Sequence, residues 1–308
     1  MTLQGDWLAG ELNVGYPESS FGTDSGVREL FPGIVQRFEV NETTNKNTFW
    51  GFGRNSLDAG PRAGPKGFSN TKYEVNGRIE WLWCQDTYDN SPFLWLFFQD
   101  PGTGTGYTIY PSDTLPKFLD LEMMYDSTLY RYLTGVVVDS MTINVRENEI
   151  VTGELSFLAK SFSNSASGYA LKTGTYGTPI VPQFGNVTLT TGDSAIDRYI
   201  IPDFKMTFKN NVRMHYDVKS SDKYPSAATA EKFEAQIDIS FLVEEDYIRS
   251  KIEDTVFSSI EVHIGQTTIR FKNAQITSPF PIKISSDMGV RKETYTFVPE
   301  LVEVVFNA

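Results

Sequence analysis

The residue types that most often do chemistry are few and scattered in this chain. It has one cysteine, Cys84, and two histidines, His215 and His263, which lie far apart. A zinc site of usual composition needs several cysteine and histidine ligands, so these residues cannot build one. A single cysteine also cannot form an intramolecular disulfide, which fits a reducing compartment. We expect no metal and no cofactor.

Motifs of the common enzyme classes do not occur. The sequence contains no G-x-S-x-G, no P-loop and no Rossmann fingerprint. The glycine-rich stretch Gly102–Gly106 is not followed by a helix whose N-terminus could bind phosphate, so we interpret it as a loop. We therefore predict that the chain is not an enzyme.

Carboxylates are the one reactive group in excess, with a formal net charge of −12. An acidic chain does not hold nucleic acid by counterion release, which needs clustered lysine and arginine. Glu147, Glu149 and Glu154 flank a predicted turn, and Glu147 and Glu149 share a face if the flanking segment is extended. They form either a solvated turn or an acidic surface. A glycosidase pair would need two singled-out carboxylates, and nothing singles out two here.

Aromatic residues allow a second function. Trp81, Trp83, Trp95, Tyr107 and Tyr110 could form a stacking platform for sugars, although the three tryptophans lie in the most apolar stretch, which favours core packing. The alternative to a structural role is therefore a carbohydrate-binding or glycan-processing β-sandwich, which predicts solvent-exposed tryptophans.

The elements that would position these residues are mainly strands. Leu133–Phe157 contains two runs that alternate apolar and polar residues around a polar turn, and Lys272–Phe297 repeats this pattern more weakly. Lys72 with Lys232, and Phe157 with Phe297, align the two halves in the same order. We predict an all-β fold with minor α, built from tandem β-sandwich or partial-barrel domains that each carry a short flanking helix.

Breaks in these patterns set the predicted boundaries. Asn41–Thr71 is rich in turn residues and is interpreted as a long loop, and Gly77 suggests a bulge. Ser91 and Pro92 begin a predicted helix, and the segment 244–259 places Ile248, Ile252 and Val256 on one helical face. The predicted organisation is a first domain over residues 1–160, a linker or arm over residues 161–185 and a second domain over residues 186–308.

The N-terminus lacks a basic region followed by an apolar stretch, so no signal peptide is expected. The longest apolar cluster, Phe93–Phe98, is far too short to span a bilayer. We expect neither secretion nor membrane integration.

One passage resembles a known family. Tyr132–Lys160 contains Gly135 before apolar β-residues, an alternating strand at Met141–Ile143, a polar turn, and Thr152–Gly153 at the start of the next strand. This arrangement resembles the tail tube proteins of long-tailed bacteriophages and related archaeal viruses. Val75–Trp83 and the helix after it are also similar to the strand-and-helix element of that family.

The resemblance implies a structural virion protein, the major tail tube subunit, assembled in the host cytoplasm and located in the virion tail. Its partners would be further copies of itself, other tail proteins such as the tape measure and the terminator, and double-stranded DNA passing through the channel. Two tube domains per chain imply a ring of three chains with pseudo-six-fold symmetry, and one implies a hexamer. A tail terminator or baseplate ring is a further possibility.

The resemblance also assigns surfaces. Asn41–Thr71 is expected to make ring-to-ring contacts, with the arm Ser161–Gly185 second. The candidate residues facing the channel are Glu147, Glu149 and Glu154, with two counterparts from the second copy. Those counterparts are Asp287 and Glu293.

Overall fold

A computed structural model describes most of the chain, and it is almost entirely β-structure with two short helices. This confirms the predicted fold class, all-β with minor α. We call residues 12–165 the first half and residues 178–306 the second half. The described residues are 12–15, 18, 20–23, 29–49, 67–85, 91–97, 108–111, 118–126, 129–165, 178–181, 186–217, 223–243, 256–277 and 291–306.

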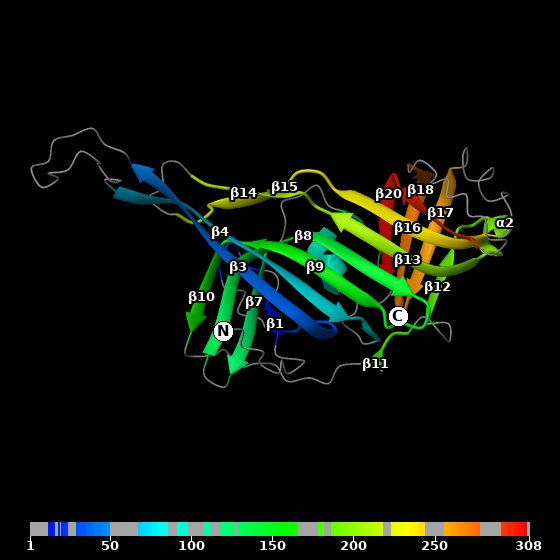
Figure 1. Ribbon diagram of the computed structural model, residues 1–308, viewed down its shortest axis with the longest axis horizontal. Coiled ribbons are helices and arrows are strands. Elements are labelled where there is room, and N and C mark those ends of the chain that lie inside the picture. Colours follow the sequence, from blue (N-terminus) through cyan, green and yellow to red (C-terminus); the bar gives the residue numbers. More distant parts are fainter. Residues whose placement is uncertain are drawn as a thin grey trace, which may run out of the picture.

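Each half has its own succession of elements (Figure 1). Those of the first half are β1 (Leu12–Gly15), β2 (Glu29–Leu30), β3 (Ile34–Phe49), β4 (Gly67–Leu82), β5 (Cys84–Gln85), α1 (Ser91–Phe97), β6 (Thr108–Ile109), β7 (Leu119–Asp126), β8 (Leu129–Arg146), β9 (Thr152–Ala159) and β10 (Ser161–Ser165). Those of the second half are β11 (Thr178–Pro179), β12 (Val187–Thr190), α2 (Ser194–Asp197), β13 (Ile200–Lys209), β14 (Val212–His215), β15 (Ala227–Ala230), β16 (Glu234–Val243), β17 (Phe257–Ile264), β18 (Thr267–Ile276), β19 (Arg291–Val298) and β20 (Leu301–Phe306).

One long antiparallel sheet crosses both halves in the order β3-β4-β9-β8-β13-β16-β19. Figure 1 shows these strands running side by side along the length of the molecule. The halves join where β8 pairs with β13, with Met141 opposite Phe208 and Ile143 opposite Met206. No edge is therefore exposed where the two halves meet.

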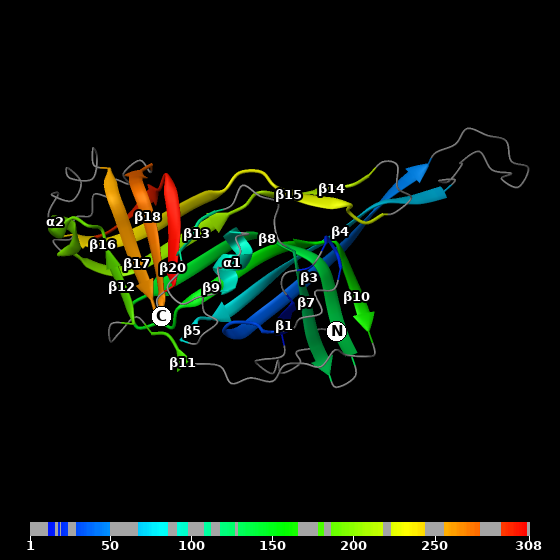
Figure 2. The same ribbon diagram turned by 180° about the vertical axis from the view of Figure 1, so that it is seen from behind.

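Two outer groups of strands pack behind the long sheet, with α1 between them (Figure 2). One runs β2-β1-β7-β8-β10 and the other β12-β17-β18-β20-β6. β8 and β18 each belong to an outer group and then continue toward the long sheet. Gly135 (φ 61°) and Asn273 (φ 51°) stand at the bends, where a left-handed conformation redirects the strand.

The same succession of pairings thus occurs twice. β3-β4-β9-β8 in the first half corresponds to β13-β16-β19-β18 in the second. Gly77 lies opposite Phe157, and Ile237 lies opposite Phe297. Since Ile237 follows Gly77 by 160 residues and Phe297 follows Phe157 by 140, these registers agree with the alignment of Lys72 with Lys232 and Phe157 with Phe297.

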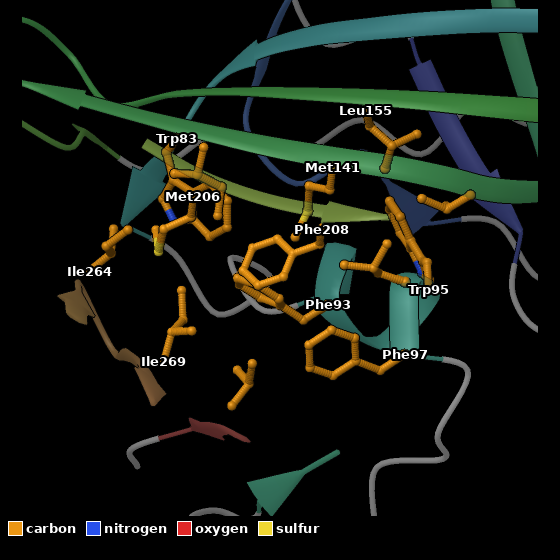
Figure 3. Close-up of a cluster of buried hydrophobic side chains, with 14 of the residues drawn as sticks. Trp83, Phe93, Trp95, Phe97, Met141, Leu155, Met206, Phe208, Ile264 and Ile269 are labelled. Carbon is orange, nitrogen blue, oxygen red and sulfur yellow. The ribbon is translucent and has the colours of Figure 1, made fainter. Parts of the chain in front are cut away.

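The main apolar core of the described residues lies between the long sheet and the outer groups, and residues from both halves form it. Figure 3 shows α1 presenting Phe93 and Phe97 to Phe208 of β13. The ring centroids of Phe93 and Phe208 are 5.9 Å apart, and those of Phe208 and Phe271 are 6.0 Å apart. Buried Asn210 donates from its amide to the carbonyl of Leu96 (2.8 Å) and that of Val138 (3.0 Å). Phe208 and Asn210 therefore tie the second half to the helix of the first.

Two reciprocal glycine–aromatic pairs hold β4 against β9. Gly77 of β4 lies opposite Phe157 of β9, and Trp81 of β4 lies opposite Gly153 of β9. A Cβ atom at either glycine would overlap the aromatic ring beside it. Gly77 pairs regularly on both sides, so the predicted bulge there is wrong: the residue is small because the Phe157 ring occupies the space of its side chain.

The structure also changes two predicted loops. Asn41–Phe49 and Gly67–Thr71, expected within one long loop, form the paired outer part of the β3–β4 hairpin, while residues 50–66 lie outside the described residues. Ser161–Ser165, the start of the predicted linker, is strand β10 on β8. Strand pairing satisfies the backbone of these polar stretches although their composition resembles that of loops.

The two predicted helices and the second predicted hairpin have different outcomes. The helix at Ser91 is α1. Of the helix expected over residues 244–259, residues 244–255 lie outside the described residues, and residues 257–259 belong instead to the strand β17, so the prediction is wrong there. The hairpin predicted over Lys272–Phe297 is formed by β18 and β19, which pair with each other at only two described positions. Most pairs of β18 are with β17 and β20, and most pairs of β19 are with β16.

Gly153→Ala should destabilise the protein by about 1–3 kcal/mol, because the added methyl group overlaps the indole of Trp81 in a packed core. Urea unfolding followed by tryptophan fluorescence measures the change. Thr152→Ala is the matched control, since Thr152 lies on the other face of the same strand. Equal stability of the two variants would contradict this packing.

Candidate functional surface

The face of the long sheet that points away from the core is polar. Along each strand, core residues alternate with polar ones, so the polar side chains of neighbouring strands form one continuous surface. Its described carboxylates and its described cations are equal in number. The carboxylates are Glu39, Glu74, Glu80, Glu154, Asp203, Glu234 and Asp238, and the cations are Arg37, Lys72, Arg78, Arg146, Lys205, Lys209 and Lys292.

Opposite charges on this face pair with one another in the first half. The Nη2 atom of Arg78 lies 2.7 Å from Oε1 of Glu80 and 2.8 Å from Oε2 of Glu154. Arg37 pairs with Glu39, and its Nη1 atom lies 3.7 Å from Oε1 of Glu80. One network therefore crosses β3, β4 and β9 and leaves little uncompensated charge there.

The second half continues this pattern. Lys292 of β19 pairs with Asp203 of β13, and the Ser240 hydroxyl donates to Asp203 at 2.7 Å. Burial raises the pKa of Asp203, but the hydrogen bonds from Lys292 and Ser240 outweigh it and hold the pKa below its usual value. The Thr296 hydroxyl donates to Asp238 at 2.6 Å. Both of these carboxylates are thus hydrogen-bonded to neighbouring strands.

The predicted candidate residues do not all belong to this surface. Glu154 does, within the network around Arg78. Glu147 and Glu149 are exposed in the turn between β8 and β9, where Arg146 Nη1 lies 3.5 Å from Glu149 Oε2. The turn places them at the end of the surface.

The two second-copy residues stand apart. Glu293 lies opposite Phe241 on the other face of the sheet, and it accepts a hydrogen bond from the Tyr295 hydroxyl. It therefore cannot share a surface with Glu154. Asp287 lies outside the described residues.

Sequence reasoning missed the cations of this surface. Arg78 and Lys205 alternate with core residues just as Glu154 does, and the same period of two that identified the strands would have found them. The net charge of −12 favoured a prediction of carboxylates alone, although this charge describes the whole chain and not one face.

The tryptophans are part of the core. Trp81 and Trp83 are 1% exposed and Trp95 is 5% exposed, so these three cannot form a stacking platform at the surface. Tyr110 is exposed, and Tyr107 lies outside the described residues. The core interpretation of the tryptophans is confirmed.

The described residues contain no group of three or more histidine, cysteine or carboxylate side chains placed to hold a metal ion. None of the helices in this described part is both long and apolar enough to cross a membrane.

Glu18 is a buried carboxyl beneath the bend in β8. It is 7% exposed and accepts hydrogen bonds from the backbone N–H of Gly135 (2.7 Å) and that of Gly22 (2.8 Å). Burial raises the pKa of Glu18 to about 7, although both hydrogen bonds act in the opposite direction. Its charge therefore changes near neutral pH, at the point where β8 leaves the outer group.

The arrangement is that of a β-rich protein with a long sheet, a polar, charge-paired face on that sheet, a large apolar core, and no metal-binding group of side chains among the described residues. The comparison with protein families agrees. The family model for the phage tail tube protein matches residues 12–298. The chain belongs to this family, a family of structural tail proteins, and it is a component of the virion tail. A search of curated proteins found no match.

Rising pH should destabilise the protein between about pH 5 and pH 7 through Glu18. Below its unfolded pKa of 4.5 the carboxyl is protonated in both states, whereas above that value only the unfolded state ionises readily until the pH passes about 7. After allowance for solvent screening, the loss is about 1–2 kcal/mol. Unfolding by urea at a series of pH values measures it.

Glu18→Gln should flatten this pH dependence whatever its effect on absolute stability, because an amide does not titrate. Glu147→Gln, in the exposed turn, is the control and should keep the wild-type dependence. An unchanged slope for Glu18→Gln would contradict the assignment.

Proposed function

We propose that this protein is the major subunit of a tail tube, in which rings of three chains stack around a channel for double-stranded DNA. The observation that carries the proposal is the pairing of β8 with β13 inside the chain. Two halves with the same succession of pairings are already joined edge to edge there. The same kind of joint between chains would close a ring.

The free edge of the long sheet supports this. Among the described residues, β3 pairs only with β4, which leaves its outer edge open over residues 34–49. Its counterpart in the second half, β13, has the equivalent edge covered by β8. An exposed edge this long invites pairing with another chain, and joining each β3 to the second half of the next chain removes it.

The two halves would then be two tube-type domains, over residues 1–160 and 186–308, with the segment 161–185 between them. Three chains would contribute six such domains and give pseudo-six-fold symmetry. A hexamer would be the arrangement if only one half took part in the sheet around the channel. The shared strand order β3-β4-β9-β8 and β13-β16-β19-β18 favours three chains.

The polar face of the long sheet would line the channel, and the apolar core would lie outside it. Paired charges suit this use, because an excess of cations would hold the phosphates of DNA and slow its passage. Glu154 would face the channel, Glu147 and Glu149 would lie at its rim, and Glu293 would not take part. The lining is close to neutral in its described residues, which differs from the acidic lining expected from net charge.

Contacts between stacked rings, and with the tape measure and terminator proteins, stay predictions. The sequence assigned ring-to-ring contact to Asn41–Thr71 and Ser161–Gly185, of which residues 50–66, 166–177 and 182–185 lie outside the described residues.

Negative-stain electron microscopy of the concentrated, purified protein tests the proposal. We expect hollow rings and stacked tubes whose end-on class averages show three-fold symmetry. Rings of six chains would contradict two tube domains per chain, single rings that never stack would favour a terminator or baseplate role, and isolated particles at every concentration would contradict assembly.

Glu80→Gln with Glu154→Gln tests the channel lining. These changes remove the two negative charges that compensate Arg78, so tubes should form while DNA release from virions slows several-fold. Release triggered in vitro and followed with a DNA-binding dye measures the effect.

Glu261→Gln is the matched control, because it removes a carboxylate from an arginine pair in the outer group, where Arg270 Nε lies 3.1 Å from Glu261 Oε1. Equal release from both variants would show that the polar face does not meet DNA.

A further inference from the structure

The hairpin β14–β15 of the second half lies across the first half. Val137 of β8 is fully buried, and it forms a small apolar cluster with Ala228 of β15, against which Val212 and Met214 also pack. The backbone N–H of Val212 donates to Asp139 Oδ1 at 2.8 Å. This hairpin, which we call the second-half arm (residues 212–230), therefore crosses the joint between the halves.

Residues near the outer end of this arm contact Tyr73 of β4. The Tyr216 hydroxyl donates to the Tyr73 carbonyl at 2.9 Å, and the Tyr73 N–H donates to the Lys223 carbonyl at 3.0 Å. The rings of Tyr73 and Tyr224 meet edge to face with centroids 4.8 Å apart. Between arm and sheet lies a groove of about 570 Å³ whose floor includes Leu158. The arm holds the two halves together from the side.

The first half carries an equivalent hairpin, the outer part of β3–β4, whose described residues 44–49 and 67–73 we call the first-half arm. In the first half, Thr43 pairs with Glu74 and Lys46 with Asn70, so two residues of β3 face three of β4. In the second half, Lys209 pairs with Glu234 and Val212 with Ala230, again two residues against three.

The same count of two residues against three supports the equivalence of the arms. Counting onward from it, Phe68 of β4 occupies the register position of Ala228 of β15, and Thr48 occupies that of Met214. In strand pairing, the described residues of the first-half arm pair only with one another. A surface equivalent to the one that the second-half arm crosses can therefore be supplied by another molecule.

On the second half, the surface equivalent to that around Val137 and Leu158 is exposed. Gln275 occupies the register position of Val137, and Val298 occupies that of Leu158. Gln275 is exposed, and Val298 is 38% exposed, whereas Val137 is fully buried. Nearby Leu301 is 40% exposed. An apolar patch at a place that the other half keeps covered indicates a missing contact.

We propose that the first-half arm of one chain docks on this surface of the next chain in the same ring, around Gln275 and Val298. The proposal rests on the ring proposed above. It assigns the paired part of the hairpin to contact within a ring, in place of the ring-to-ring contact expected from the sequence. The partner is a second copy of this chain.

Charge complementarity supports the choice of partner. The first-half arm contains Lys46 and Lys72 and no carboxylate, so it is cationic in a chain of net charge −12. On the second half, Glu300 next to the patch and Glu234 on β16 are exposed. A cationic arm on an acidic neighbour is favoured at low ionic strength and helps to set its orientation.

Cysteine cross-linking in assembled rings tests the proposal. The one native cysteine, Cys84, is buried, so introduced cysteines react selectively. Phe68→Cys with Gln275→Cys should be joined between chains by a short bismaleimide, and the ladder on a denaturing gel should stop at three chains. Phe68→Cys with Ile200→Cys, at the far end of the strands, should give little product.

The outcomes separate the two proposals. Rings in which the Phe68–Ile200 pair cross-links and the Phe68–Gln275 pair does not would overturn this inference alone. So would a ladder that extends beyond three chains from rings that microscopy shows to be three-fold, because the cross-links would then join different rings. If neither wild type nor variants form rings, the proposed function falls together with the inference. If Phe68→Cys prevents assembly, Thr48→Cys with Val298→Cys probes the same contact and is expected to give the same ladder.

Discussion

The pairing of β8 with β13 is the constraint on which the rest of the structure depends. It makes one sheet out of two halves, and it fixes which face of every strand meets the core, because a slip of one residue would turn each side chain to the opposite face. Met141 and Ile143 on one strand, and Phe208 and Met206 on the other, must all point inward for the joint to form. The polar face, the free edge of β3 and the crossing arm follow from this register.

The two halves are equivalent in topology but not independent in packing. Phe208 of β13 packs between a ring of α1 and a ring of β18. The Asn210 amide donates hydrogen bonds to two carbonyl groups that belong to the first half. A buried amide that loses such partners leaves carbonyl groups unsatisfied, which is costly. The halves therefore stabilise one another, and this joint shows in one chain the contact that we propose between chains.

Much of this architecture follows from the sequence wherever strands cover the core. The hairpin β8–β9, the helix that begins at Ser91 and the alignment of the halves come from apolar alternation and capping, which depend on local sequence. The outer part of β3–β4 was interpreted as a loop because polar residues follow one another there and no alternation marks a buried face. Gly77 was misjudged because its partner, the Phe157 ring, arrives from a strand distant in sequence.

The candidate surface was harder to predict, and its errors have simple causes. Glu293 was matched with the first-copy carboxylates, but the residue 140 positions after Glu154 is Thr294. A shift of one residue is small in sequence and reverses the face of a strand. The bend in β8 and the crossing arm depend on long-range contacts, so only the folded chain reveals that Gly135 and Asn273 serve the same purpose.

The covalent union of the two halves also changes how a closed assembly can begin. In the proposed ring, every second joint between domains is made as the chain folds, at the high effective concentration of a linked pair. Nucleation then requires two encounters between chains where six separate domains would require five, so its rate depends less steeply on the amount of free protein. The fusion also allows the two arms to diverge in length and charge, as a ring of identical single domains could not.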